Sequence, residues 1–248
     1  MTKKQKRYLM ASAIFILTFG VMTNVGAMHI MEGYLPGVFC IGWGVVCLPF
    51  LAAGFHSIKK ALNANRKVLP LLAMAGAFVF VISSLKIPSV TGSCSHMTGT
   101  GLGAILFGPT AVSILGIIVL LFQAILLAHG GLTTLGANTF SMAIAGPFVS
   151  YGVYKLCEKS KINRKLSIFL AAAIGDLFTY CVTALQLAIA HHADTTVAGA
   201  AGKFLAVFAP TQIPLAVIEG IITVLIVTAL ETYAKPEMRA IGFLKEAH

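Results

Sequence analysis

The sequence predicts an all-α, polytopic integral membrane helical bundle, with about seven transmembrane segments after a cleavable N-terminal signal segment. Of its 248 residues, 58% are hydrophobic and only 10% are charged, whereas an ordinary soluble domain is about a quarter charged. Apolar runs of roughly 20 residues follow one another, and each is long enough to cross a hydrocarbon layer of about 30 Å as a helix. The mean hydropathy of +0.90 agrees with this fold class.

The first 27 residues have the parts of a secretory signal peptide. A cluster of basic residues precedes an apolar run that extends from Tyr8 to Met22. The small residues Val25 and Ala27 then fit the −3 and −1 positions of a signal-peptidase site. The sequence therefore predicts a signal peptide over residues 1–27 and a single transmembrane domain over residues 28–248.

Six apolar segments follow the signal segment. They cover residues 37–55, 68–85, 101–127, 137–156, 166–190 and 204–230. With six crossings, the basic cluster near residues 155–165 would lie outside, against the positive-inside rule. Gly108-Pro109 interrupts the third segment, because proline cannot continue the hydrogen-bond ladder of a helix interior. A short or buried crossing before Pro109 and a full span after it make seven, which places every basic cluster inside.

Seven crossings also predict the orientation of the chain in the cytoplasmic membrane. The mature N-terminus faces outward with the loop of residues 86–100 and the loops that contain His129 and His191, and the C-terminus is cytoplasmic. The net charge of +10 is then explained by loops and tails, so it indicates no nucleic-acid partner. The five cysteines include no CxxC pair, and they predict neither a zinc ribbon nor a redox motif.

Cleavage before Met28 would create a set of metal ligands that the uncut chain lacks. The α-amine of Met28, the deprotonated amide nitrogen of His29 and the His29 imidazole can close a five-membered and a six-membered chelate ring around one ion. A fourth nitrogen completes a planar set that suits Ni(II), Cu(II) or low-spin Co(II), whereas Mg(II) and Ca(II) prefer oxygen ligands. The alternative is that His29 is an interfacial residue just outside the membrane.

His96 is the candidate for the fourth nitrogen ligand. It lies in residues 90–101, which are rich in glycine, serine and threonine. Irregular backbone of this kind is tolerated at membrane depth only where it is buried in protein or lines a cavity, and neutral imidazole is a common ligand. The alternative is a loop histidine hydrogen-bonded to its serines. Cys94 and Met97 could offer sulfur, but soft ligands favour Cu(I) or Zn(II), so we interpret both as neighbouring or packing residues.

Three further histidines lie in loops that are predicted to face outward. His129 precedes a polar, glycine-rich break, and we interpret it as structural, with a backup ligand or a residue on the access path as alternatives. His191, His192 and Asp194 have the residue types of a metal site, but they follow the end of a helix in a loop of small residues. There we expect transient surface binding or no role.

Six polar side chains fall within the predicted membrane segments. They are Gln123, Asn138, Asp176, Gln186, Gln212 and Glu219. Because such groups are costly in lipid, they are expected to face the bundle interior or a polar surface. Some of them could bond the second ring nitrogen of a ligand histidine, which is the usual way to orient such a ligand. The chain has no GxxxxGK[ST] phosphate loop, and no HExxH or GxSxG motif supports a membrane hydrolase.

Four blocks of the sequence resemble the CbiM family, the substrate-capture (S) components of energy-coupling-factor cobalt transporters in the CbiM/NikM group. The blocks are Met28–Pro36, Lys86–His96, His129–Asn138 and Thr211–Ala216. The resemblance extends from Met28 to about Tyr233 and goes far beyond shared hydrophobicity. Met97, where proline is expected in many relatives, and the N-terminal extension depart from the pattern of the family.

The resemblance implies a subunit that captures Co(II) as the transported substrate and supplies cobalamin biosynthesis, with Ni(II) as the alternative metal. It implies Met28, His29 and His96 as the metal-site residues, and no bound organic cofactor. The implied partners are membrane lipid, a small membrane subunit of the CbiN type, a coupling subunit of the CbiQ type and ATPases of the CbiO type. ATP hydrolysis then belongs to those partners, and this chain is not an enzyme.

Two other classes of function stay open at this point. A metal-dependent membrane enzyme would need an open coordination position and a general base, and Glu32 is the only carboxylate close to His29 in the sequence. A structural scaffold within a complex would bind neither Co(II) nor Ni(II) stoichiometrically.

Overall fold

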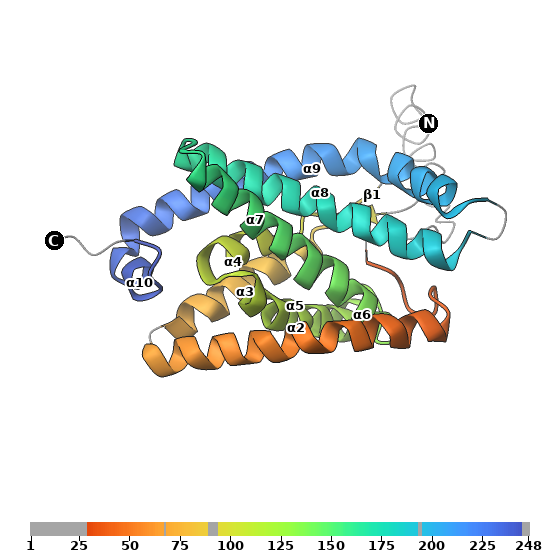
Figure 1. The fold of residues 1–248 in the computed structure, drawn as a ribbon, viewed down its shortest axis with the longest axis horizontal. Helices are drawn as coiled ribbons and strands as arrows, with labels where there is room; N and C mark the ends of the chain where they lie inside the picture. The colour runs from red at the N-terminus through yellow and green to blue at the C-terminus, as the bar shows by residue number, and fades with distance from the viewer. Residues whose placement is uncertain (1–28, 67, 89–93, 193–194, 245–248) are drawn as a thin grey trace, which may run out of the picture.

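The computed structural model describes residues 29–66, 68–88, 94–192 and 195–244, which form a bundle of helices (Figure 1). The predicted signal segment and Met28 lie outside the described residues. Within this described part of the chain, four helices could cross a membrane by length and composition: α2 (Gly37–Ala64), α5 (Pro109–Leu127), α8 (Arg164–Ala190) and α9 (Val197–Tyr233). A shorter apolar helix, α3 (Val68–Ser84), follows α2. The helical class is confirmed, and the count of seven crossings stays a prediction.

The predicted break at Gly108-Pro109 is present. α4 (Thr100–Phe107) ends before Gly108, and Pro109 begins α5, a position where the missing N–H of proline costs no intrahelical hydrogen bond. α4 has only eight residues, and those from Thr100 to Leu106 are all buried. It is therefore a short helix inside the bundle, which agrees with the short or buried segment predicted before Pro109.

A helical stretch over residues 135–159 contains a π-helix. α6 (Leu135–Asn138) leads into η1 (Thr139–Ala145), and η1 leads into α7 (Gly146–Lys159). π-Helical turns are rare and frequently mark functional sites. Gly116 allows α5 to approach η1 closely, since a Cβ at this glycine would collide with the Cβ of Ala143. Small residues at such contacts let membrane helices pack together.

The loop before α4 includes a small hairpin that the all-helical prediction did not anticipate. β1 (Ile87–Pro88) pairs antiparallel with β2 (Cys94–Ser95), with Ile87 opposite Ser95. The hydroxyl oxygens of Ser95 and Thr211 lie 2.8 Å apart and join the hairpin to α9. The hairpin leads the chain into the bundle immediately before His96.

Within the described residues, the basic clusters at the end of α2, at the turn between α7 and α8 and after α9 gather at one end of the bundle. In Figure 1, α2 and α9 both run toward the left-hand end, where the turn between α7 and α8 and the helix α10 (Lys235–Ala240) also lie. There Arg164 forms a salt bridge of 2.7 Å with Glu231, and the buried Met238 of α10 packs in a cluster with Tyr154. The start of α2, the end of α8 and the start of α9 lie at the opposite end.

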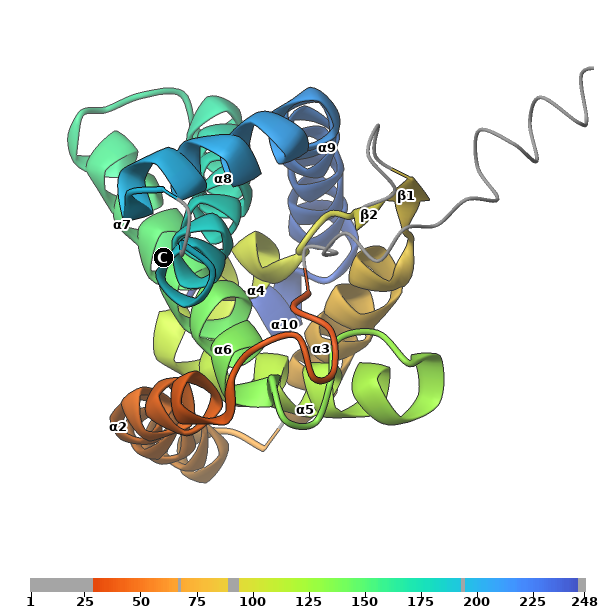
Figure 2. The same ribbon diagram turned by 90° about the vertical axis from the view of Figure 1, so that its right-hand side faces the viewer.

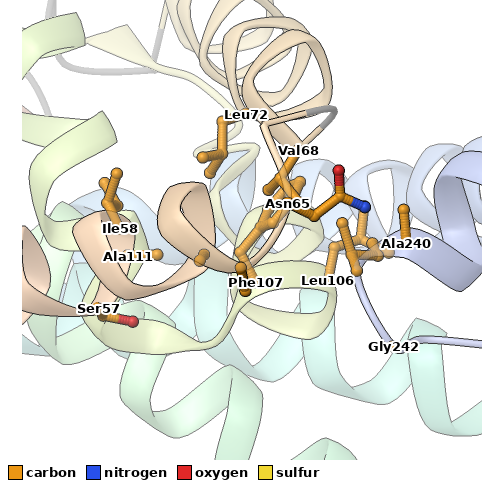
Figure 3. Close-up of a pocket in the computed structure, with 13 residues that line it drawn as sticks. Ser57, Ile58, Asn65, Val68, Leu72, Leu106, Phe107, Ala111, Ala240 and Gly242 are labelled. Carbon is orange, nitrogen blue, oxygen red and sulfur yellow. The ribbon is translucent and has the colours of Figure 1, made fainter.

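A pocket of about 340 Å³ lies at the basic end (Figure 3). The end of α2, the start of α3, the junction of α4 with α5, and α10 line it with mostly apolar side chains, among them Leu72 and Phe107. Neither His29 nor His96 lines this pocket. It is therefore separate from the predicted metal site.

Candidate metal centre

Three histidines bring one ring nitrogen each to a single buried place. His29 Nδ1 lies 2.8 Å from His96 Nε2 and 2.7 Å from His129 Nε2, and the three ligand atoms all lie within 4.8 Å of one another. At most 2% of each of these residues is exposed. The structure thus brings the two predicted histidine ligands together. It also places His129, which the sequence suggested to be structural, in the same cluster.

The segment that carries His29 enters the bundle at the end opposite the basic loops. Figure 2 looks onto this end and shows the red start of the described chain inside the ring of helices, beside β2 and α4. Asn138 Oδ1 accepts a hydrogen bond of 2.8 Å from the N–H of Ile30, and Asn138 Nδ2 donates one of 3.0 Å to the Ile30 carbonyl. Thr134 Oγ1 donates to the same carbonyl at 2.6 Å. The backbone beside His29 is therefore fully paired and held by α6 and the residue before it.

Glu32 ties the same segment to the loop after His129. Its carboxylate accepts a hydrogen bond of 3.2 Å from the backbone N–H of Thr133. Hydrogen bonding from Thr133 also lowers the pKa of Glu32 below its usual value, so the carboxylate is charged at neutral pH. Because this carboxylate is committed to Thr133, the structure gives no support to Glu32 as the general base of a membrane enzyme.

The loop that carries His96 is held by α8 and α9. The hydroxyl of Tyr180 accepts a hydrogen bond of 3.2 Å from the His96 N–H, and Gln212 Nε2 donates one of 3.4 Å to the His96 carbonyl. The carboxylate of Glu219 accepts from the N–H of Thr98 at 2.6 Å and from the N–H of Gly99 at 3.0 Å. Gly99 has a φ of +68°, a left-handed conformation that favours glycine. These contacts fix the backbone on both sides of the ring.

The six polar side chains predicted within the membrane segments are all buried, as expected. Gln212 donates to Asp176, and Gln123 donates to Ser83 Oγ at 2.7 Å. The suggestion that such groups bond the second ring nitrogen of a ligand histidine is wrong for His29 and His96. The nitrogen of His96 contacts the backbone carbonyl of Met97, and that of His29 contacts the thioether of Met142 on η1.

His96 and His29 each have a second ring nitrogen outside the cluster, and each of these nitrogens contacts a group that only accepts hydrogen bonds. His96 Nδ1 lies 2.9 Å from the carbonyl of Met97, and His29 Nε2 lies 3.2 Å from Met142 Sδ. A carbonyl oxygen and a thioether sulfur accept hydrogen bonds but cannot donate them. His96 Nδ1 is therefore the protonated nitrogen of its ring. A proton on His29 Nε2 has Met142 Sδ as its acceptor, and in that tautomer the unprotonated nitrogens His29 Nδ1 and His96 Nε2 lie 2.8 Å apart.

Two unprotonated nitrogens at this distance favour a cation that lies to one side of the line joining them. Two nitrogens bound at right angles to one ion, with bonds of roughly 2.0 Å, would be about 2.8 Å apart, which matches the separation of His29 Nδ1 and His96 Nε2. The Nδ1 of His129 has no hydrogen-bond partner among the described residues, so its own tautomer is not fixed in this way. The site therefore offers His29 Nδ1 and His96 Nε2 in rings whose second nitrogen has a partner, and His129 in a ring whose tautomer no such partner fixes.

Burial keeps the three rings neutral. They lie in connecting segments outside the spanning helices, and burial is the largest cause that lowers the pKa of His96 to about 4. Burial, reinforced by the charge that a protonated His96 would carry, also lowers the pKa values of His29 and His129. All three are thus neutral at pH 7, which is the form that binds a metal ion.

The histidines of the α8–α9 loop do not form a second centre in the described part of the chain. His191 is exposed, and its Nε2 donates to the carbonyl of Tyr34 at 2.9 Å. His192 is also exposed and donates to the carbonyl of Ile189, while Asp194 lies outside the described residues. Of residues 29–66, 68–88, 94–192 and 195–244, only His29, His96 and His129 form a group of three suitable side chains.

Replacing Asn138 with aspartate is expected to weaken metal binding by roughly 10- to 100-fold, the usual effect of losing a group that orients a ligand. Aspartate keeps the size of the side chain but replaces the amide nitrogen with an oxygen. In the wild-type chain that nitrogen donates a hydrogen bond to the Ile30 carbonyl, and the oxygen of aspartate cannot. Equilibrium dialysis with Co(II) measures the change. Gln123→Met is the control, because it removes a buried amide that contacts α3 instead. Equal affinity in the wild-type and Asn138→Asp chains would contradict this role.

Comparison with known proteins identifies the family of the chain. Residues 29–238 match the model of the family CbiM, described as the cobalt uptake substrate-specific transmembrane region. A cobalt transport protein CbiM from Lachnoclostridium phytofermentans is 68% identical over 98% of both chains. Another, from Chlorobium limicola, is 59% identical over 95% of this chain and 94% of that protein.

Solved structures agree with these relatives. A crystal structure of a truncated transition metal transporter has a TM-score of 0.74 and 30% identity, and the match covers 83% of this chain and 99% of that one. A second transition metal transporter gives the same score over 84% of this chain and 94% of the other. The named relatives are transport proteins, and with its apolar helices this chain is a multi-pass membrane protein. It belongs to the CbiM family of cobalt uptake transmembrane proteins.

Proposed function

We propose that this chain is the substrate-binding S component of an energy-coupling-factor importer, which captures Co(II) at the outer side of the cytoplasmic membrane for cobalamin biosynthesis. One observation carries the proposal: a ring nitrogen of His29 and a ring nitrogen of His96, both buried and neutral, lie 2.8 Å apart. Relatives of this chain are named cobalt transport proteins, which supports Co(II) as the transported substrate.

The ligands in this proposal are the α-amine of Met28, the amide nitrogen and Nδ1 of His29, and Nε2 of His96. A chelate ring that runs from the amide nitrogen through the side chain closes with six members only at Nδ1. Met142 Sδ can accept a hydrogen bond from His29 Nε2, and the tautomer protonated at Nε2 keeps Nδ1 available for that ring. The arrangement requires a free amine at Met28, and hence removal of residues 1–27.

Nickel is the second candidate substrate. A planar set of four nitrogens suits Ni(II) at least as well as Co(II), and affinity generally rises from cobalt to nickel. Cobalt is preferred here because the relatives are named for it. Competition between Co(II) and Ni(II) in equilibrium dialysis measures the preference directly, and a scaffold protein would bind neither ion stoichiometrically.

The proposed partners follow from the family and from what this chain lacks. It has no phosphate-binding loop, so we assign ATP hydrolysis to ATPases of the CbiO type, acting through a CbiQ-type coupling subunit and with a CbiN-type small subunit. The basic loops gather at one end of the bundle, and the positive-inside rule assigns that end to the cytoplasm. The histidine cluster then lies toward the outer side.

Uptake of radioactive Co(II) tests this function. Cells without a cobalt importer of their own would express the CbiN-, CbiQ- and CbiO-type subunits with or without this chain. We expect accumulation only when the chain and an ATPase competent for hydrolysis are both present. Equal accumulation in cells that lack the chain would contradict the proposal.

A further inference from the structure

We propose that Met142, on the π-helical turn η1, positions His29 for metal binding by accepting a hydrogen bond from its Nε2–H. The proposal rests on the proposed function, because it concerns the same histidine. It assigns to a buried methionine a role that neither the residue type nor the sequence pattern indicated.

The contact is specific and enclosed. Met142 Sδ lies 3.2 Å from His29 Nε2, and only 1% of Met142 is exposed. The residue also belongs to an apolar cluster with Val79, Val119 and Leu120. The thioether thus lies between this apolar cluster and the edge of the His29 imidazole. There the sulfur is the acceptor for a hydrogen bond from Nε2–H.

The hydrogen bond selects one tautomer of His29. With the proton on Nε2, the lone pair of Nδ1 points toward His96 and His129, whose Nε2 atoms lie 2.8 and 2.7 Å away. The other tautomer would direct an N–H into the cluster and leave no lone pair there for a metal ion. Since a buried donor without a partner is costly, removing the sulfur makes the productive tautomer less favourable.

Two side chains that position His29 lie close together in sequence, one in α6 and one in η1. Asn138 ends α6, and Met142 follows four residues later in η1. Asn138 holds the backbone of Ile30 from both sides, and Met142 contacts the ring of His29. Together they orient the backbone and the ring nitrogen that the chelate at His29 needs.

Met142 is a positioning residue rather than a ligand. Its sulfur contacts Nε2, which is on the opposite edge of the imidazole from Nδ1, where the other two histidine nitrogens gather. The imidazole ring of His29 therefore lies between the sulfur and the other two histidines. This placement keeps a soft donor out of a nitrogen site, and soft donors favour Cu(I) or Zn(II).

Ni(II) binding by the mature chain that begins at Met28 tests the proposal, with equilibrium dialysis as the measurement. Met142→Leu keeps an apolar side chain of similar size but removes the acceptor, and we expect roughly tenfold weaker binding. Met142→Gln supplies an amide oxygen in its place and is expected to restore most of the affinity. Met238→Leu is the matched control, because Met238 is also a buried methionine but packs in a cluster with Tyr154 at the other end of the bundle.

The tautomer itself is the second readout. Ring ¹⁵N spectra of the metal-free protein, labelled at histidine, are expected to show His29 protonated at Nε2 in the wild type and a mixture of tautomers in Met142→Leu. A purely structural role would lower thermal stability without changing this signal. If the Met142→Leu chain has the same affinity and the same His29 tautomer as the wild type, the inference is overturned. The proposed function still stands in that case, because the wild-type chain binds the metal. Absence of metal binding by the wild type would instead overturn the proposed function, and the inference with it.

Discussion

The chain with His96→Ala is expected to bind Co(II) more than about 100-fold more weakly than the mature wild-type chain, an effect larger than the loss of an orienting group. The substitution removes one of the two ring nitrogens that lie 2.8 Å apart. His29→Ala should have an effect at least as large, because it removes the ring that closes the chelate. Isothermal titration of the purified chains with Co(II) measures both losses.

His191→Ala is the matched control for these substitutions. His191 is a histidine at the same end of the bundle, but it is exposed and bonds the carbonyl of Tyr34. Its replacement is expected to leave the affinity for Co(II) unchanged. Binding that persists at wild-type strength in both the His29→Ala and His96→Ala chains would refute the proposed site.

Adding a single alanine before Met28 is expected to weaken Co(II) binding by more than about 100-fold, again beyond the effect of losing an orienting group. The extra residue converts the α-amine of Met28 into an amide and moves the new amine away from the ring of His29. Asn138 and Thr134 hold Ile30 in place, so the chain cannot slide by one residue to compensate. Titration of the extended and mature chains gives the comparison.

An alanine added after His248 is the control for the extended chain, since it changes the length without touching the N-terminus. We expect this chain to bind as the mature protein does. Unchanged affinity in the chain extended before Met28 would show that the α-amine is not a ligand.

Much of the bundle could be predicted from local patterns. The break at Gly108-Pro109 follows from the chemistry of proline, and the buried α4 follows from the requirement that the basic loops share one side. The burial of polar residues such as Gln123 and Glu219 follows from their cost in lipid. The proline break and the polar burial depend on a short window of the chain, whereas the prediction for α4 uses basic loops that are far apart in the sequence.

The rest of the site depends on long-range packing. His129 contacts His29 across 100 residues of sequence, and Met142 reaches His29 across 113. Neither the π-helix nor the hairpin of β1 and β2 has a pattern that periodicity detects, since both are set by what packs around them. The glycine-rich break after His129 was the one local signal that pointed to the third histidine.

Native mass spectrometry of the protein isolated from its own membrane tests whether removal of residues 1–27 creates the metal site, because it reports the N-terminus and the bound metal in one measurement. We expect a chain that begins at Met28 and carries one Co(II) or Ni(II) ion. A chain that retains residues 1–27 and still carries one of these ions would refute the proposed site.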